Sequence, residues 1–162
     1  MTVGLLIIAT NKYTKFIQPL IDSADKFFLK DVKHKMLFSK EKDVEVIYHI
    51  FTDKTNQIIE TDRKVIFYPI EHKPWPLVTL SRYETFYNNK WALLDNNYLF
   101  YCDVDMLFVD SIGKEILSKR VATLHPGYVD SVGTPERNLN STAYIREPEN
   151  NKYFAGGFNG GE

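Results

Sequence analysis

Stretches of apolar residues divide this chain into alternating predicted strands and helices. The first stretch, residues 3–9, is apolar throughout, which is typical of a central parallel strand covered on both faces. Between residues 16 and 28, apolar side chains recur at spacings of three and four, which predicts an amphipathic helix with Pro19 in its first turn. Further apolar runs predict strands at residues 44–51, 65–68, 98–102 and 121–124.

The second half of the chain adds helices and then a long region without periodicity. Pro74-Trp75-Pro76 predicts a rigid loop, followed by helices at about residues 79–94 and 112–117. From Gly127 onward, the pairs Gly156-Gly157 and Gly160-Gly161 are expected to form turns or to allow close backbone approach. The alternation of strands and helices predicts an α/β fold with a mostly parallel sheet, in a single domain spanning residues 1–162.

Two aspartates, Asp103 and Asp105, directly follow the predicted strand 98–102. Residues two apart on a strand point to the same face, so the two carboxylates are expected to converge where that strand reaches the carboxyl edge of the sheet. Two hard oxygen ligands suit Mg²⁺ or Mn²⁺ and leave positions for substrate phosphate oxygens. The pattern therefore favours a metal-bridged diphosphate, hence a nucleotide-sugar enzyme. The alternative is a strand that ends in two solvated or helix-capping aspartates.

The composition narrows the functions and the compartment. A net charge of -1 argues against a broad surface for nucleic acid or anionic membranes, so we expect neither partner. The lone cysteine, Cys102, precludes an intrachain disulfide, is expected to be buried and inert, and fits a reducing compartment. The N-terminus lacks a basic leader and its apolar run is too short to span a bilayer. We therefore expect a cytoplasmic protein without a membrane anchor.

Segments spread over the whole chain carry a family resemblance. They are Asn11-Lys12-Tyr13, residues 21–28 and 48–53, Trp75 with Arg82, residues 98–108 and 123–127, Glu136-Arg137, and residues 143–145 and 153–161. In this order they resemble glycosyltransferase family 6, a family of retaining enzymes. The resemblance implies a Rossmann-like nucleotide-sugar-binding fold of the GT-A type, a UDP-sugar donor (UDP-galactose, UDP-N-acetylgalactosamine or similar), Mn²⁺ (or Mg²⁺) and a glycan acceptor.

The resemblance also implies roles for particular positions. Those implied at the donor are Ile8, Ala9, Thr10 and Tyr13 around uracil and ribose, Val78 and Arg82 beside the diphosphate or sugar, and Asp103, Val104 and Asp105 at the metal and ribose. Those implied at the other substrate are His125 and Thr134 at the acceptor, with Ala155, Gly156 and Gly157 where the sugar is bound and its specificity is tuned. Soluble bacterial relatives often carry Asn-x-Asn and need no metal, whereas the aspartates here indicate metal dependence.

The resemblance does not extend to the family's catalytic carboxylate. Family members continue beyond the position of Glu162, and the glutamate of the retaining reaction lies in that continuation; Glu162 itself does not match it. We therefore assign no catalytic residue and expect residues 1–162 to lack the family's C-terminal catalytic portion. Two hypotheses follow: a metal-dependent retaining hexosyltransferase acting on a glycan hydroxyl, or a truncated UDP-sugar- and metal-binding module with little transferase activity. A third, an unrelated metal-dependent phosphotransfer or receiver-like domain, has no Gly-rich phosphate loop to support it.

Several of these residues also have a simpler structural interpretation. Tyr13 could pack on the edge of the sheet, Arg82 could be a solvated charge on a helix, and His125 could be a hydrogen-bonded structural residue. Trp91, within the helix predicted at residues 79–94, is expected to lie in the core.

Overall fold

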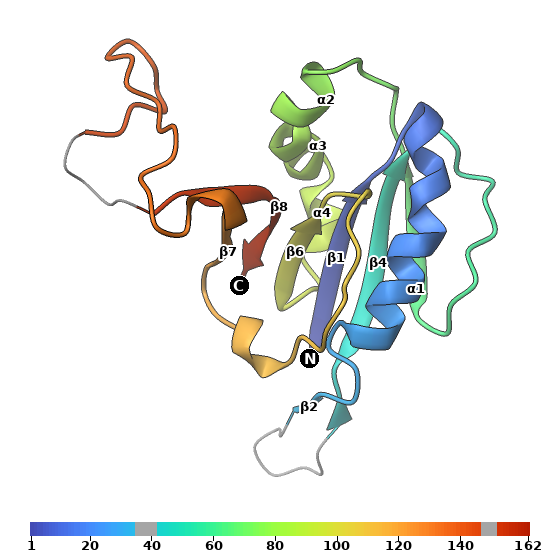
Figure 1. Cartoon of the computed structure of the whole chain (residues 1–162). Coiled ribbons are helices and arrows are strands. Elements are labelled where there is room, and N and C mark those ends of the chain that lie inside the picture. The colour runs from blue at the N-terminus through green and yellow to red at the C-terminus, as the bar shows by residue number, and fades with distance from the viewer. Residues whose placement is uncertain (35–41, 147–151) are drawn as a thin grey trace.

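The computed structural model describes residues 1–34, 42–146 and 152–162 of the chain. Its centre is a six-stranded sheet in the order β5-β4-β1-β6-β8-β7 (Figure 1). The strands of this sheet are β1 (Thr2–Ile8), β4 (Glu45–Thr52), β5 (Lys64–Pro69), β6 (Tyr98–Cys102), β7 (Val121–Leu124) and β8 (Phe154–Gly161). Strands β5, β4, β1 and β6 are parallel, and β8 runs antiparallel to both β6 and β7. The predicted α/β fold with a mostly parallel sheet is confirmed.

Short helices and one longer helix cover the two faces of the sheet. The 3₁₀-helix η1 (Asn11–Phe16) leads into α1 (Ile17–Phe27), and two further 3₁₀ turns are η2 (Lys114–Ile116) and η3 (Pro126–Tyr128). The other helices are α2 (Leu77–Leu80), α3 (Arg82–Asn88) and α4 (Lys90–Leu93), and a separate antiparallel pair is formed by β2 (Lys33–His34) and β3 (Lys42–Asp43). In the described part of the chain, no helix has the length and apolar character needed to cross a membrane.

The single helix predicted at residues 79–94 is wrong, because polar side chains interrupt it. Ser81 and Asn89 separate the three short helices. The Ser81 hydroxyl donates to the carbonyl of Leu77 at 2.7 Å, and the Asn89 amide donates to the carbonyl of Thr85 at 2.9 Å. Such bonds compete with the backbone ladder and favour a break in the helix. Similarly, the helix predicted at residues 112–117 is reduced to the turn η2.

Strand β1 is buried on both faces, as its apolar run predicted. Val3, Leu5 and Ile7 pack on the side of α1, and Leu6 and Ile8 pack on the side of α3 and α4. Burial of such side chains is the main source of stabilisation in a fold of this size. The central strand therefore fixes where the carboxyl ends of β1 and β6 lie.

A buried histidine links β4 to β5 and to the turn that precedes β6. His49 is 1 % exposed, and its Nδ1 lies 2.9 Å from the Tyr68 hydroxyl. Its Nε2 lies 3.2 Å from Nδ2 and 3.5 Å from Oδ1 of Asn96, whose Nδ2 also donates to the carbonyl of Leu93. Both ring nitrogens of His49 therefore have polar partners inside the fold. Burial lowers the pKa of His49 to about 4.

This histidine is expected to make the fold sensitive to acid. Its native pKa lies below the value of about 6.5 in an unfolded chain, so between those pH values the unfolded state binds the extra proton. The free energy of unfolding should therefore fall by about 3 kcal/mol between pH 6.5 and pH 4 from this group alone. Urea unfolding of His49→Gln should give a lower stability at pH 7.5 but a flatter decline with acid. His72→Gln, which alters an exposed histidine, is the control, and an equally steep decline in His49→Gln would contradict the assignment.

Candidate functional site

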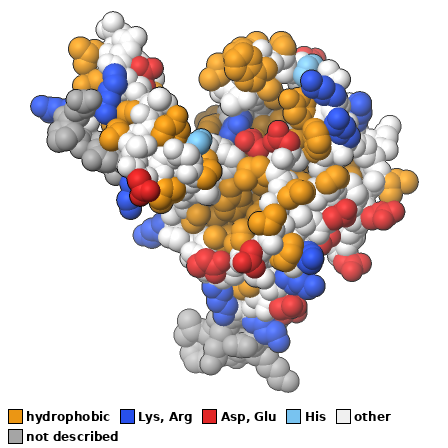
Figure 2. Space-filling view, viewed as in Figure 1, with side chains coloured by type: hydrophobic (Ala, Val, Ile, Leu, Met, Phe, Trp, Pro, Cys, Tyr) orange, Lys and Arg blue, Asp and Glu red, His pale blue; other side chains and the backbone are white. Residues whose placement is uncertain are grey.

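A cleft of about 300 Å³ opens at the carboxyl edge of β1 and β6. These strands are parallel neighbours, so their carboxyl ends meet at one edge, where open α/β sheets bind ligands. The lining residues are Ile8, Thr10, Tyr13, Trp75, Val78, Thr79, Arg82, Tyr101, Asp103, Val104 and Asp105. Figure 2 shows acidic side chains gathered at this end of the sheet, below the apolar surface of α2. Residues from three separate segments of the chain therefore share one cavity.

The two aspartates reach the cleft from a turn, not from a strand. β6 ends at Cys102, and the Met106 N–H donates to the carbonyl of Asp103 at 3.2 Å. Val104 is buried, Asp103 is half-buried and Asp105 is exposed. The expectation that strand alternation aligns the carboxylates is wrong, because the pleat ends one residue before the motif. The turn nevertheless brings both carboxylates to the same cleft.

Asp103 is held by a buried arginine and a buried tyrosine. Arg82 Nη2 lies 3.3 Å from Asp103 Oδ1, and the Tyr101 hydroxyl donates to the same oxygen. Arg82 Nη1 donates to the carbonyl of Gly156 at 2.8 Å, and its guanidinium carbon lies 4.0 Å from the centre of the Tyr101 ring. Burial, reinforced by the bond to Asp103, raises the pKa of Tyr101, which therefore stays a neutral hydrogen-bond donor.

Arg82 is not a solvated charge. The residue is 8 % exposed, and among the described residues its Nε has no hydrogen-bond partner. Burying an unpaired donor is costly, whereas a guanidinium suits the oxygens of a phosphate. The arginine therefore retains donor capacity beside the cleft after its bonds to Asp103 and Gly156 are counted.

The donor set fits a hard divalent cation that also binds substrate. Among the described residues, no group of three or more His, Cys, Asp and Glu side chains is placed to hold a metal. Two carboxylates alone leave most positions of an octahedral ion for water or phosphate, as Mg²⁺ and Mn²⁺ sites do. Gly157 allows β8 to approach the aspartate turn closely, because a Cβ there would lie 2.6 Å from Met106 Sδ and 3.3 Å from Asp103 Oδ2.

The other wall of the cleft comes from the loop after β1. Tyr13 is 41 % exposed, and Thr10 shares a hydrogen bond of 2.8 Å with His72 Nδ1. Asn11 has a φ of 55°, and its N–H donates to the carboxylate of Asp53 at 3.0 Å. Ala9, which the resemblance also implied at the donor, is buried and does not line the cleft. Tyr13 lines the cleft and is partly exposed.

The comparison with protein families decides the classification. The family model described as Glycosyltransferase family 6 matches residues 1–162. The chain belongs to glycosyltransferase family 6. Its GT-A type α/β fold agrees with this membership.

Curated proteins of known name are similar over the whole chain. Rat histo-blood group ABO system transferase 1 is 34% identical over 170 residues, which are 99% of this chain and 45% of that protein. Dog globoside alpha-1,3-N-acetylgalactosaminyltransferase 1 is 34% identical over 171 residues, which are 99% of this chain and 46% of that protein. The human protein of the same name is 33% identical over 172 residues, covering 100% of this chain and 46% of that protein. The chain thus spans about half the length of the curated relatives it matches.

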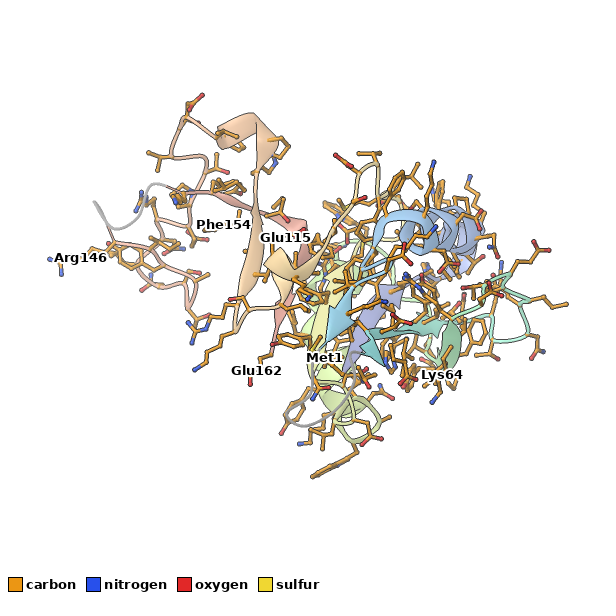
Figure 3. All side chains as sticks on the ribbon, turned by 90° about the horizontal axis from the view of Figure 1, so that it is seen from below. Met1, Lys64, Glu115, Arg146, Phe154 and Glu162 are labelled. Carbon is orange, nitrogen blue, oxygen red and sulfur yellow. The ribbon has the colours of Figure 1, made fainter. Side chains whose placement is uncertain are left out.

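The positions that family 6 resemblance assigns to the sugar and acceptor fall into two groups. Gly156 and Gly157 lie beside the cleft, because their carbonyls accept from Arg82 and from the Asp103 N–H, and Ala155 precedes them in β8. His125 and Thr134 are not in the cleft lining. They belong to residues 125–146, a segment that projects away from the sheet (Figure 1). Figure 3 shows Arg146 at the far end of this projecting segment.

An aromatic cluster in this projecting segment surrounds His125. The His125 ring lies 4.8 Å from that of Tyr128 and 5.7 Å from that of Tyr153, between ring centres. The Thr134 hydroxyl donates to the Tyr153 hydroxyl at 3.3 Å, and Nδ1 of His125 accepts from the Gly127 N–H. His125 therefore has a structural hydrogen bond. Both residues that the resemblance implies at the acceptor, His125 and Thr134, contact Tyr153.

Sequence reasoning missed Tyr101 as a site residue and misplaced Trp91. In the sequence, Tyr101 belongs to an apolar run and gives no sign of a polar role. In the structure, its hydroxyl donates to Asp103, which follows the end of β6 at Cys102. Trp91 is 77 % exposed, so its expected place in the core is wrong. Cys102 is buried as expected, and burial raises the pKa of its thiol to about 12, which makes it a poor nucleophile.

Proposed function

We propose that this chain forms the donor-binding part of a metal-dependent retaining hexosyltransferase that uses a UDP-sugar. The observation that supports this most is the cleft in which Asp103 and Asp105 face Arg82 and an exposed aromatic ring, Tyr13. A site for a UDP-sugar needs cationic and metal-binding groups for the diphosphate. It also needs a flat apolar surface beside them for the uracil ring. The two kinds of surface lie within one cavity.

In this proposal, different residues of the chain contact different parts of the UDP-sugar. Tyr13, with Ile8 and Thr10, contacts the uridine, and the guanidinium of Arg82 donates to the diphosphate or the sugar. Asp103 and Asp105 would hold Mn²⁺ or Mg²⁺. When bound, this ion would neutralise charge on the leaving UDP and act as a Lewis acid.

The transferred sugar and the acceptor are placed on the β8 side. Gly156 and Gly157 lie beside Arg82 and Asp103, so we propose that the hexose is bound next to this stretch of β8. The names of two relatives specify N-acetylgalactosamine transfer with an alpha-1,3 linkage, so we propose UDP-N-acetylgalactosamine or UDP-galactose as donor. A glycan hydroxyl, oriented by His125 and Thr134, is the proposed acceptor, and a cytoplasmic location is part of the same proposal.

Calorimetric titration with UDP and four UDP-sugars tests the donor assignment. UDP-galactose, UDP-glucose and their N-acetyl derivatives are titrated into the chain with Mn²⁺ and with EDTA. We expect binding that Mn²⁺ strengthens by about tenfold or more, because the ion bridges the carboxylates and the diphosphate. Equal affinity in EDTA would contradict the role of the aspartates, and no binding of any nucleotide would contradict the proposed function.

A second measurement separates transfer from binding alone. The chain is incubated with the tightest-binding UDP-sugar and a galactose-terminated oligosaccharide, and glycan product and free UDP are both quantified. Product whose new linkage keeps the donor's anomeric configuration by NMR supports the retaining transferase. UDP-sugar binding without product would favour the binding module over the transferase.

A further inference from the structure

We propose that Tyr101 is a positioning residue that sets which divalent cations the Asp103–Asp105 site accepts. By engaging one oxygen of Asp103, it would limit this carboxylate to a single ligating oxygen and favour Mn²⁺ and Mg²⁺ over Ca²⁺. This inference rests on the proposed function, because it places a cation at these two carboxylates.

The two carboxylate oxygens of Asp103 have different surroundings. Oδ1 accepts from the Tyr101 hydroxyl and lies 3.3 Å from Arg82 Nη2. Among the described residues, none donates a hydrogen bond to Oδ2. Oδ2 lies on the side of Gly157, where the absent Cβ would otherwise crowd it at 3.3 Å. One oxygen is thus engaged by two donors, and the other has no hydrogen-bond donor among the described residues.

Tyr101 cannot easily move its hydroxyl away from Asp103. It belongs to β6 and is 6 % exposed. Its ring packs against α3, with the guanidinium of Arg82 at 4.0 Å and the ring of Phe86 at 5.7 Å between centres. A buried side chain with these contacts has little room to change its rotamer, so the hydrogen bond to Oδ1 is a fixed part of the cleft wall.

The consequence for a cation follows from coordination chemistry. Ca²⁺ takes six to eight oxygens and often uses both oxygens of a carboxylate, whereas Mg²⁺ demands an octahedron of single oxygens. Binding through both oxygens of Asp103 would require Oδ1 to give up bonds from a phenol and a guanidinium. Such charge-assisted bonds are among the stronger ones in proteins. Ca²⁺ therefore loses more than Mn²⁺ or Mg²⁺ at this site.

Tyr101→Phe tests the inference, because it deletes the hydroxyl and keeps the ring that packs against Arg82 and Phe86. Affinities for Mn²⁺, Mg²⁺ and Ca²⁺ are measured in saturating UDP, by electron paramagnetic resonance of free Mn²⁺ and by competition. We expect the affinity for Ca²⁺ relative to Mn²⁺ to rise about three- to tenfold in the variant, the size of one hydrogen bond. If Tyr101→Phe does not fold, Tyr101→Met fills similar space without a donor and takes its place.

Tyr48→Phe is the matched control. The Tyr48 hydroxyl donates to Asp25 Oδ1 at 2.6 Å, so this variant deletes another buried tyrosine–aspartate bond, and neither residue lines the cleft. Its ratio of Ca²⁺ to Mn²⁺ affinity should equal that of the unmodified chain. An unchanged ratio in Tyr101→Phe, or a parallel loss for all three ions, would overturn the inference and leave Tyr101 a structural residue only. Failure of the unmodified chain to bind UDP or Mn²⁺ would instead count against the proposed function.

Discussion

Replacing Asp105 by asparagine should remove most of the metal-dependent donor binding of this chain. Asp105 is exposed in the cleft, and none of the described residues forms a hydrogen bond or ion pair with its carboxylate. Its full charge is therefore free for a cation, and an amide supplies neither that charge nor a second equivalent oxygen. Substituting a residue that only hydrogen-bonds a metal ligand already costs about 10–100-fold in metal affinity. We therefore expect the loss of a direct ligand in Asp105→Asn to weaken Mn²⁺-dependent UDP binding by about 100-fold or more.

Two further aspartate variants separate the loss of a metal ligand from a loss of stability. Asp103→Asn should weaken Mn²⁺-dependent binding similarly, and it should also lower the melting temperature because the Arg82 guanidinium loses its ion pair. Asp110→Asn, an exposed aspartate outside the cleft lining, should match the unmodified chain in both measurements. Calorimetric titration of UDP at micromolar Mn²⁺ gives the affinities. Unchanged affinity in both Asp103→Asn and Asp105→Asn would refute the metal role of the pair.

The apolar pattern predicted the parallel half of the sheet because each strand there carries its own signal. Residues 3–9 and 98–102 are continuous apolar runs, and they become β1 and β6 with boundaries shifted by at most a residue. A parallel strand buried on both faces is a nearly continuous apolar run, so its own sequence indicates it. The cleft follows from this, since parallel strands place their carboxyl ends together.

Strand β8 escaped prediction because its stability comes from its neighbours. Its sequence, FAGGFNGG, is half glycine, which disfavours a strand on propensity and indicates turns. At Gly160, however, a Cβ would lie 2.1 Å from the carbonyl oxygen of Leu99 in β6, so only glycine permits this approach. Phe158, stacked at 5.6 Å on Phe100, anchors the strand from the core. These pairings join segments far apart in the chain, and local patterns do not report them.

The resemblance grouped some of the implied residues as the structure does, and others not. Resemblance placed Tyr13 and Arg82 near the aspartates, and the structure brings all of them to one cavity. It also implied His125 and Thr134, which lie on the projecting segment away from that cavity. The burial of Arg82 was not predictable from its polar helix position, because it depends on Gly156 in β8 and on Asp103 in the turn after β6.

Arg82→Met is the second substitution with a large expected effect, because the guanidinium serves both the fold and the cleft. Its loss leaves the carbonyl of Gly156 and Oδ1 of Asp103 short of a donor, in a place where the arginine side chain is 10% exposed. Asp103 is 36% exposed and partly screened, so we expect a loss of stability of about 1–3 kcal/mol. In a chain of this length that lowers the melting temperature by about 3–10 °C.

The same variant should lose donor affinity beyond its loss of stability. Removal of charge-assisted bonds to a diphosphate is expected to weaken UDP binding by about 10- to 100-fold, with Mn²⁺ present and at a temperature well below unfolding. Arg120→Met, at an exposed arginine outside the cleft lining, is the matched control and should change neither value. If folded Arg82→Met binds UDP as tightly as the unmodified chain, the arginine holds Asp103 and β8 in place without touching the donor. The phosphate would then depend on the cation alone, and Arg82 would have to be reassigned as a structural residue.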